Sequence, residues 1–236
     1  MPRTDAPLSA TPRTRLTRER HHQVEDRGRL HALLGEALIG HLAIDRGGFP
    51  VAMPIAYAID LDGPDDGGTV YLHASVAAGW MAGAAGRTVS LTVTEIDGLV
   101  AARSGFNHSM NYRAAVIIGE TRVVSDEEER GHALDLIVDH MIPGRAATLR
   151  PATRKELAAT QVLALPLAEA SLKVSEGDPD DEPEDVAAGI WAGVIPVRRI
   201  ADAVVPDPQA TGPVPADVRA RAEALADAGP AASAAP

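Results

Sequence analysis

The alternation of apolar and polar side chains predicts one helix followed by a series of short strands. Over residues 23–38 the apolar positions recur at helical spacing, and Gly40 ends the pattern. Six β-rich stretches follow, separated by turns rich in Gly, Asp and Pro. They span residues 41–44, 50–59, 69–75, 88–95, 99–103 and 113–124. Because the turns are tight, we expect an antiparallel meander that closes into a barrel.

Helices are predicted around these strands. A small-residue stretch at 77–86 indicates a short helix, and Ser125 with Glu128 forms a capping-box pattern before a helix that ends near Met141. Thr153 with Glu156 repeats that pattern. The last predicted strands span 162–167 and 171–174, with a final ordered segment at 190–197 after an acidic loop at 176–185. The fold class is therefore mainly β with flanking helices.

The distribution of residue types divides the chain into three parts. Residues 1–20 form a basic leader that we expect to be flexible, residues 21–202 form the folded domain, and residues 203–236 form an Ala- and Pro-rich tail. Low apolar content predicts that the tail is disordered, with at most a frayed helix at 215–226. The sequence shows no signal peptide or membrane-spanning run.

Charge and cysteine content narrow the functional classes. The formal net charge is −11, which argues against a nucleic-acid binder because phosphate neutralisation needs clustered Lys and Arg. Cysteine is absent, which excludes disulfides, thiolate nucleophiles and iron–sulfur clusters. We expect a soluble, cytoplasmic protein that does not contact membranes.

Two segments contain groups of polar residues that are suited to binding a ligand. The first contains His73 and Ser75, at a strand end that leads into a helix, where helix amides favour phosphate; Ser75 is equally suited to be an N-cap. The second, residues 104–113, is a polar loop that ends in Arg113, whose guanidinium suits a phosphate dianion. A plain polar loop would explain this second segment as well.

Other candidates are less distinctive. Pro54, between Met53 and Ile55, removes a donor within a strand and indicates an edge, a bulge or a ligand-facing strand. The eight histidines form no metal-binding motif, so no dedicated metal site is predicted. A single axial haem ligand needs no partner spacing, however, and His73 or His108 is suited to that role.

The order of these signals resembles the pyridoxamine 5'-phosphate oxidase-like family over residues 20–197. The motifs that show the resemblance are Gly40-His41-Leu42, residues 51–57, Tyr71-Leu72-His73-Ala74-Ser75 and residues 109–116. They are most similar to the flavin-nucleotide-binding branch that includes the nitroimidazole-resistance proteins. The resemblance implies an antiparallel six-stranded split β-barrel of the FMN-binding type, and a homodimer with the cofactor between subunits.

The resemblance also implies site residues. Met53, Pro54 and Ile55 would lie beside the isoalloxazine ring, and His73 and Ser75 near the ribityl-phosphate or the substrate. The remaining residues expected to bind the cofactor are Trp80, Ser109, Asn111, Tyr112 and Arg113. His73 is the candidate catalytic residue, as a proton donor to a small-molecule substrate.

One departure from the family pattern widens the cofactor prediction. Many relatives have a basic residue soon after the His-Ser segment, whereas this chain has none before Arg87. FMN is the expected cofactor, with haem or a deazaflavin as alternatives. The expected function is a flavin-dependent oxidoreductase; the alternatives are a haem enzyme or carrier on the same fold and a non-catalytic flavin-binding module.

Overall fold

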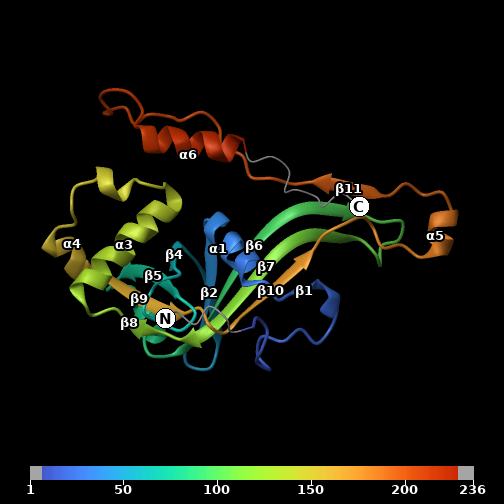
Figure 1. The fold of residues 1–236 in the computed structure, drawn as a ribbon, viewed down its shortest axis with the longest axis horizontal. Coiled ribbons are helices and arrows are strands. Elements are labelled where there is room, and N and C mark those ends of the chain that lie inside the picture. The colour runs from blue at the N-terminus through green and yellow to red at the C-terminus, as the bar shows by residue number, and fades with distance from the viewer. Residues whose placement is uncertain (1–6, 228–236) are drawn as a thin grey trace. The chain divides into compact units, whose positions relative to one another are not determined.

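The computed structural model describes residues 7–227, and antiparallel strands dominate it (Figure 1). The strands are β1 (Gln23–Val24), β2 (Gly40–Asp45), β3 (Pro50–Ile55), β4 (Tyr57–Asp60), β5 (Thr69–Ser75), β6 (Thr88–Ala101), β7 (Ser109–Glu120), β8 (Arg122–Val123), β9 (Thr160–Pro166), β10 (Ala170–Ser175) and β11 (Gly193–Pro196). The α-helices are α1 (Arg27–Glu36), α2 (Gly79–Ala84), α3 (Glu127–Met141), α4 (Arg154–Ala159), α5 (Pro183–Ala187) and α6 (Ala216–Ala226). The predicted fold class is confirmed.

The strands form two sheets. The first has the order β1-β10-β7-β6-β2-β3, with β11 also paired to β6, and the second has the order β4-β5-β9-β8. The predicted strand at 50–59 divides at Ala56, because β3 pairs with β2 in the first sheet and β4 pairs with β5 in the second. The chain therefore changes sheets at this point. The sheets do not close into a continuous barrel, so the expectation of full closure is wrong and the split form is correct.

Contacts between residues divide the chain into two compact units, and the expected single folded domain over 21–202 stays a prediction. Within the described residues, the first unit comprises residues 7–94 and 114–172, and the second comprises residues 95–113 and 173–227. Strands β6, β7 and β10 have residues in both units. Residues 7–227 contain no helix that is long and apolar enough to cross a membrane.

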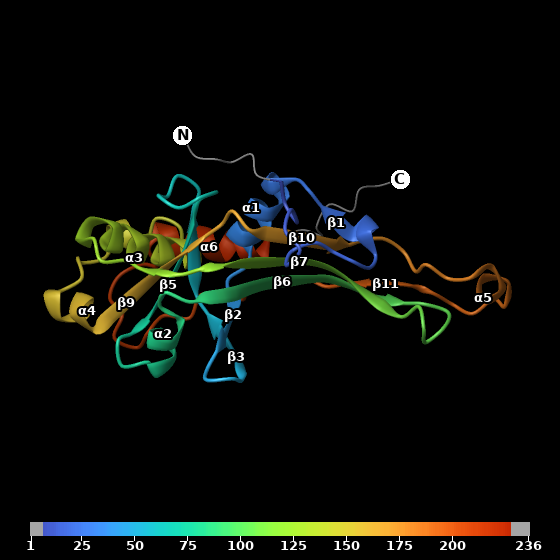
Figure 2. The same cartoon turned by 90° about the horizontal axis from the view of Figure 1, so that it is seen from below.

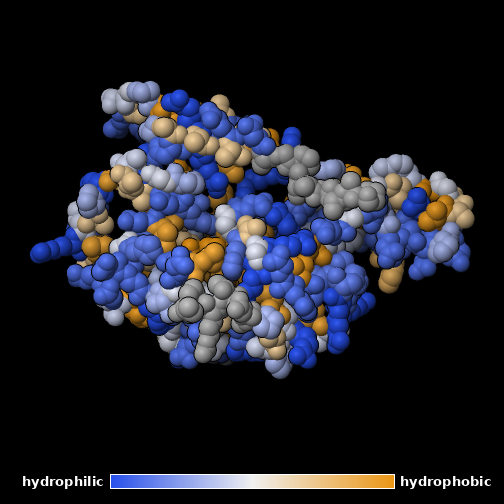
Figure 3. Space-filling view, in the orientation of Figure 1, coloured by the Kyte–Doolittle hydropathy of each residue, from blue (hydrophilic) through white to orange (hydrophobic). Residues whose placement is uncertain are grey.

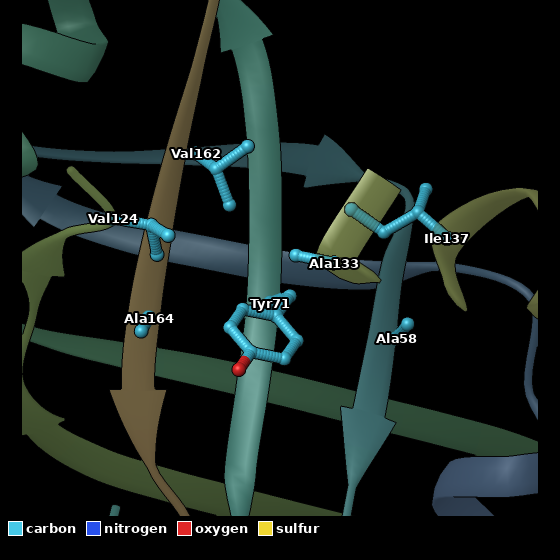
Figure 4. Packing of buried hydrophobic residues seen from close by; sticks show 7 residues of the cluster. All are labelled: Ala58, Tyr71, Val124, Ala133, Ile137, Val162 and Ala164. Atoms are coloured by element: carbon cyan, nitrogen blue, oxygen red, sulfur yellow. The ribbon is translucent and has the colours of Figure 1, made fainter. Parts of the chain in front are cut away.

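The core of the first unit includes a cluster between the second sheet and α3 (Figure 4). Its buried members are mostly small or β-branched: Ala58, Tyr71, Val124, Ala133, Ile137, Val162 and Ala164. Small side chains allow helix and sheet to approach closely, which compensates for the scarcity of aromatic residues in the chain. Tyr71 supplies the only large ring of this cluster, and its hydroxyl donates to Glu129 at the start of α3.

A second set of contacts fixes α1 against the sheets. The Tyr57 hydroxyl donates to the carbonyls of Leu34 (2.8 Å) and Ala37 (3.1 Å) at the end of α1. His140 on α3 donates through Nε2 to the Ala37 carbonyl at 2.7 Å, and its ring lies 4.8 Å from that of Tyr57. These donors satisfy carbonyls that have no partner within the helix. Two side chains distant in sequence thus determine where α1 ends.

Several predicted boundaries differ from the structure for local reasons. The predicted strands at 88–95 and 99–103 are one strand, β6, and the stretch at 113–124 is divided between β7 and β8. Helix α3 is capped by Asp126, which accepts from the Glu129 amide, rather than by Ser125. The predicted capping box of Thr153 and Glu156 is present at α4.

Ordered contacts and a helix are present toward both chain termini. Part of the leader expected to be flexible is packed: Leu8 is buried, the Ser9 amide donates to Ala170, and Arg13 forms an ion pair with Glu169. In the tail, α6 (Ala216–Ala226) forms where a helix was considered, although this segment was expected to be disordered. The predictions for residues 1–6 and 228–236 lie outside the described residues.

A charged network centred on Arg122 joins β8 to α3 and to the turn before β5. The guanidinium donates to both carboxylate oxygens of Asp65, at 2.9 and 2.8 Å, and also to Glu129. These hydrogen bonds, to Asp65 first and then to Glu129, raise the pKa of Arg122 above its ordinary value. Bidentate pairs of this kind fix geometry as well as adding energy.

We expect Arg122→Ala to lower the free energy of unfolding by about 1–2 kcal/mol, because it leaves two carboxylates without their cation. The expected loss of stability is small because 37% of the Arg122 side chain is exposed and solvent screens the charges. Chemical denaturation of this variant and of Arg46→Ala, an exposed arginine in the β2–β3 turn, measures the difference. Equal stability of the two variants would show that the network does not stabilise the fold.

Candidate cofactor site

The predicted ring-binding residues lie on β3, an edge strand of the first sheet (Figure 2). Met53 pairs with Leu42, Pro54 with His41 and Ile55 with Gly40. Pro54 is exposed and Ile55 is buried, as expected for alternate residues of a strand. The edge position explains why proline is tolerated here. The role of these residues beside a flavin ring stays a prediction.

His73 lies on β5, an inner strand of the second sheet. It is paired with Val162, a member of the core cluster, so the imidazole shares a sheet face with buried apolar side chains. Its Nδ1 atom is buried without a hydrogen-bond partner, and burial lowers the pKa of His73. A buried polar atom without a partner is uncommon and is often satisfied by a bound molecule. His73 is therefore a neutral imidazole with one unused hydrogen-bonding position.

Ser75 and Trp80 lie beyond His73 in the chain. Ser75 is exposed and its hydroxyl accepts from the Ala77 amide at 3.2 Å, forming a local turn. It is not the N-cap of α2, because that helix begins at Gly79 and its N-cap is Ala78. The helix is shorter than predicted because Val76 and Ala77 continue the turn. Trp80 lies within α2 and is half-buried.

In the second unit, Arg113 is held by a carboxylate. Its Nε and Nη2 atoms donate to the two oxygens of Asp97, at 2.9 and 2.8 Å, and about a fifth of each side chain is exposed. A bidentate pair fixes the guanidinium plane and also offsets its charge. A phosphate at Arg113 would thus meet an oriented but partly neutralised cation.

The neighbours of Arg113 on β7 are also engaged. Asn111 donates to the Gly177 carbonyl at 3.0 Å, and the Lys173 ammonium lies 5.7 Å from the centre of the Tyr112 ring. Ser109 is exposed at the start of the strand. Four of the predicted cofactor-binding residues are therefore brought together on one strand in the second unit, and the others belong to the first unit.

The sequence interpretation missed Asp97 as the partner of Arg113. A signal was present: Asp97 and Arg113 lie equally far along the chain from Gly105, the middle of the loop that joins β6 to β7. In a hairpin, residues at equal distance from the loop centre face one another across the strands. The prediction of a strand break between 95 and 99 hid this relation.

His108 lies in the β6–β7 loop and is exposed. Its Nδ1 atom is 2.8 Å from the carbonyl oxygen of Ser104. Within residues 7–227, no group of three His, Asp or Glu side chains is arranged to bind a metal ion. A haem iron at a single histidine requires no such group.

A shallow pocket lies elsewhere in the first unit, around the β2–β3 turn. Its volume is about 410 Å³ and its lining is mainly apolar, including Ile44, Phe49 and Ile118. Arg13 also borders it, with its guanidinium paired to Glu169. None of the predicted site residues lines this pocket.

Comparison with known proteins agrees with this architecture. The family model for pyridoxamine 5'-phosphate oxidase matches residues 26–174. The chain belongs to the pyridoxamine 5'-phosphate oxidase-like family. The family resemblance predicted from the sequence is thus confirmed. No curated protein matches the sequence significantly.

Solved structures of this family include long matches to the chain. It is 41% identical to the FAD and haem binding protein from Mycobacterium smegmatis, over 85% of this chain and 97% of that one, with a TM-score of 0.78. It is 34% identical to the flavocytochrome Anf3 from Azotobacter vinelandii, over 90% and 97% of the chains, with a TM-score of 0.83.

A third structure shares only the fold. It is a putative 5-nitroimidazole antibiotic resistance protein from Bacteroides thetaiotaomicron, 23% identical over 64% of this chain and 86% of that one, with a TM-score of 0.53. Members of the family with this split-barrel fold therefore include flavin-binding and haem-binding proteins.

The burial of His73 makes a prediction about pH. Its pKa in the folded chain lies below the 6.5 of an exposed imidazole, so between these values the unfolded chain binds more protons. We expect stability to fall as the pH drops below 6.5, and His73→Gln to remove this contribution. An NMR titration of the His73 imidazole should give a midpoint below pH 6.5. The midpoint should stay below 6.5 in His31→Gln, which removes the other histidine whose pKa is lowered by burial. A midpoint of 6.5 or above would contradict the assignment.

Proposed function

We propose that this protein binds a flavin and a haem and acts as a flavocytochrome-type oxidoreductase. The observation that carries the proposal is the pair of long matches, at 41% and 34% identity, to an FAD and haem binding protein and to a flavocytochrome. Both matches cover at least 85% of this chain, so the likeness extends through the second unit as well as the first.

For the flavin, FAD is the better candidate than the FMN expected from the sequence. The relative at 41% identity is an FAD and haem binding protein. Ser75 is uncharged and is engaged in a local turn, and Arg113 is oriented but partly neutralised by Asp97. The unused Nδ1 atom of His73 is a position at which a bound ring or substrate would complete a hydrogen bond.

For the haem, the residue types restrict the ligand. The chain has no cysteine, and histidine is the usual proximal ligand that remains. When bound, haem would supply one-electron chemistry and the flavin hydride or electron transfer. The role of the protein would be to bind and orient these groups and to exclude water from them.

We further propose that the protein acts on a small molecule as a homodimer. Large apolar side chains are exposed in the second unit, as Figure 3 shows near α5. They include Leu99 (46% exposed) and Ile195 (56%), which are paired across β6 and β11 and so share one sheet face. A second copy of the chain would bury such side chains.

An absorption spectrum tests the proposed function. We expect the purified protein, after incubation with FAD and haem, to show flavin bands together with a Soret band, both retained through gel filtration. A chemical reductant should bleach the flavin and shift the haem bands. Flavin bands without a Soret band would indicate a flavoprotein that binds no haem, and a Soret band without flavin bands would indicate a haem protein that binds no flavin. Bound flavin that no reductant bleaches would indicate a non-catalytic binding module.

The contribution of Arg113 is tested by substitution. We expect Arg113→Gln to weaken flavin binding about tenfold or more, the loss of roughly 1.4 kcal/mol that one charge-assisted contact can supply. The matched control is Arg199→Gln, because Arg199 also pairs with a carboxylate of β6, Glu95, at 2.8 Å. Fluorescence titration with FAD gives both affinities. Equal affinities would remove Arg113 from the flavin site.

A further inference from the structure

We infer that His108 is the axial haem ligand, binding iron through Nε2, an inference that rests on the haem-binding function proposed above. The sequence left His73 and His108 as equivalent candidates. The hydrogen bonds of the two imidazoles distinguish them.

A hydrogen bond fixes the tautomer of His108. Its Nδ1 atom lies 2.8 Å from the Ser104 carbonyl, and a carbonyl oxygen can only accept. Nδ1 must therefore carry the proton, which leaves the lone pair of the neutral ring on Nε2. Metal-binding histidines commonly donate their other ring N–H to a carbonyl or carboxylate in this way, which fixes the ring and makes it a better ligand.

The other histidines do not share this arrangement. His132 and His140 use Nε2 in contacts with Asp60 and with the Ala37 carbonyl. The Nε2 atom of His31 is buried. His73 has a buried Nδ1 without a hydrogen-bond partner, so its ring is not oriented by a hydrogen bond at that atom. Among the histidines, all of which lie within residues 7–227, His108 is the one whose Nδ1 atom contacts a backbone carbonyl.

The loop that carries His108 is held by hydrogen bonds at its start and within it. The Asn107 amide donates to the Ser104 hydroxyl at 3.2 Å, which closes the loop on itself. At its start, Arg103 donates to Asp181 from its backbone amide and from its guanidinium, both at 2.9 Å, and the Asp181 side chain is only 1% exposed. A ligand on a loop fixed in this way is held in position before iron binds.

The pairing also stabilises the charge of Asp181. Burial raises the pKa of this carboxyl, but the hydrogen bonds from Arg103, with a further one from Asn107, outweigh burial and bring the pKa below its ordinary value. Asp181 is therefore an anion that holds both ends of the segment from Arg103 to Asn107. It acts as a positioning residue for the loop.

Large apolar side chains are exposed beside the loop. Phe106 is 92% exposed and Met110 is 44% exposed, on either side of His108 in the chain. Trp191 is 72% exposed. Its ring lies against Gly193, because a Cβ atom added to that glycine would be only 3.0 Å from Cζ2 of the ring. Gly193 pairs with Ala101, the last residue of β6, so Trp191 is at the end of the strand where the His108 loop begins.

These features suit a haem in particular. A haem presents a large apolar face around an iron that needs one nitrogen ligand. Exposed aromatic side chains are costly in water, and Phe106 and Trp191 are a large share of a chain that has only 2 Phe and 2 Trp. An accessible imidazole lone pair with exposed apolar side chains nearby is the combination that a haem would cover.

The test compares His108→Ala with His73→Ala and with His41→Ala, an exposed histidine on β2. Each full-length variant is titrated with haem and, separately, with FAD. We expect His108→Ala to bind haem at least tenfold more weakly, with a changed Soret band, and to bind FAD as wild type does. The other two variants should keep the wild-type Soret band. Normal FAD binding shows that the His108 variant is folded.

Free imidazole separates ligation from a structural role. Added to His108→Ala with haem, it should restore the wild-type spectrum, because it replaces the missing ligand but not the loop contact to Ser104. A His108→Ala spectrum identical to that of wild type would overturn the inference and leave the proposed function intact. If wild type itself bound no haem while binding FAD, both the inference and the haem part of the proposed function would be wrong.

Discussion

The backbone pairing of β6 is the constraint on which both compact units depend. This strand of 14 residues pairs with β7, β2 and β11, and it has residues in both units. A slip of one residue would turn each side chain to the opposite face. The buried positions are Val89, Leu91 and Val93 in the first unit, but Gly98 and Val100 in the second. One strand thus supplies two cores from alternate sets of residues, and its register must satisfy both.

This change of parity explains what the sequence could and could not predict. The sequence prediction found β5 with its correct bounds, because residues 69–75 are a β-rich run that follows a turn, although the first four of them are all buried rather than alternately buried and exposed. The prediction divided β6 into two strands. The buried positions have odd numbers up to Val93 and even numbers from Gly98 onward, so no single alternating pattern covers the strand. His73 and Arg113 were recognised as chemically significant from their residue types. Their partners depend on pairings between distant segments, and only the fold shows that Asp97 neutralises Arg113 and that Val162 faces His73.

The ion pairs of the second unit share a pattern. Arg103, Arg113 and Arg199 each pair with a carboxylate, from Asp181, Asp97 and Glu95 respectively. In a chain with a net charge of −11, acidic residues are abundant enough to occupy its arginines. These pairs are partly exposed, so they contribute more to the geometry of the sheet and its loop than to overall stability. The same pairing reduces the positive charge available to an anionic cofactor, in a chain that also has no basic residue between Ser75 and Arg87.

The prolines of β3 affect how the molecule behaves beside its own copies. This strand is at the edge of the first sheet, and two of its six residues, Pro50 and Pro54, have no backbone N–H. An open edge with a complete row of donors can recruit another strand and begin aggregation, whereas missing donors interrupt that row. Growth of the sheet from one molecule into the next is therefore disfavoured at this edge, and association between copies is directed toward side-chain surfaces.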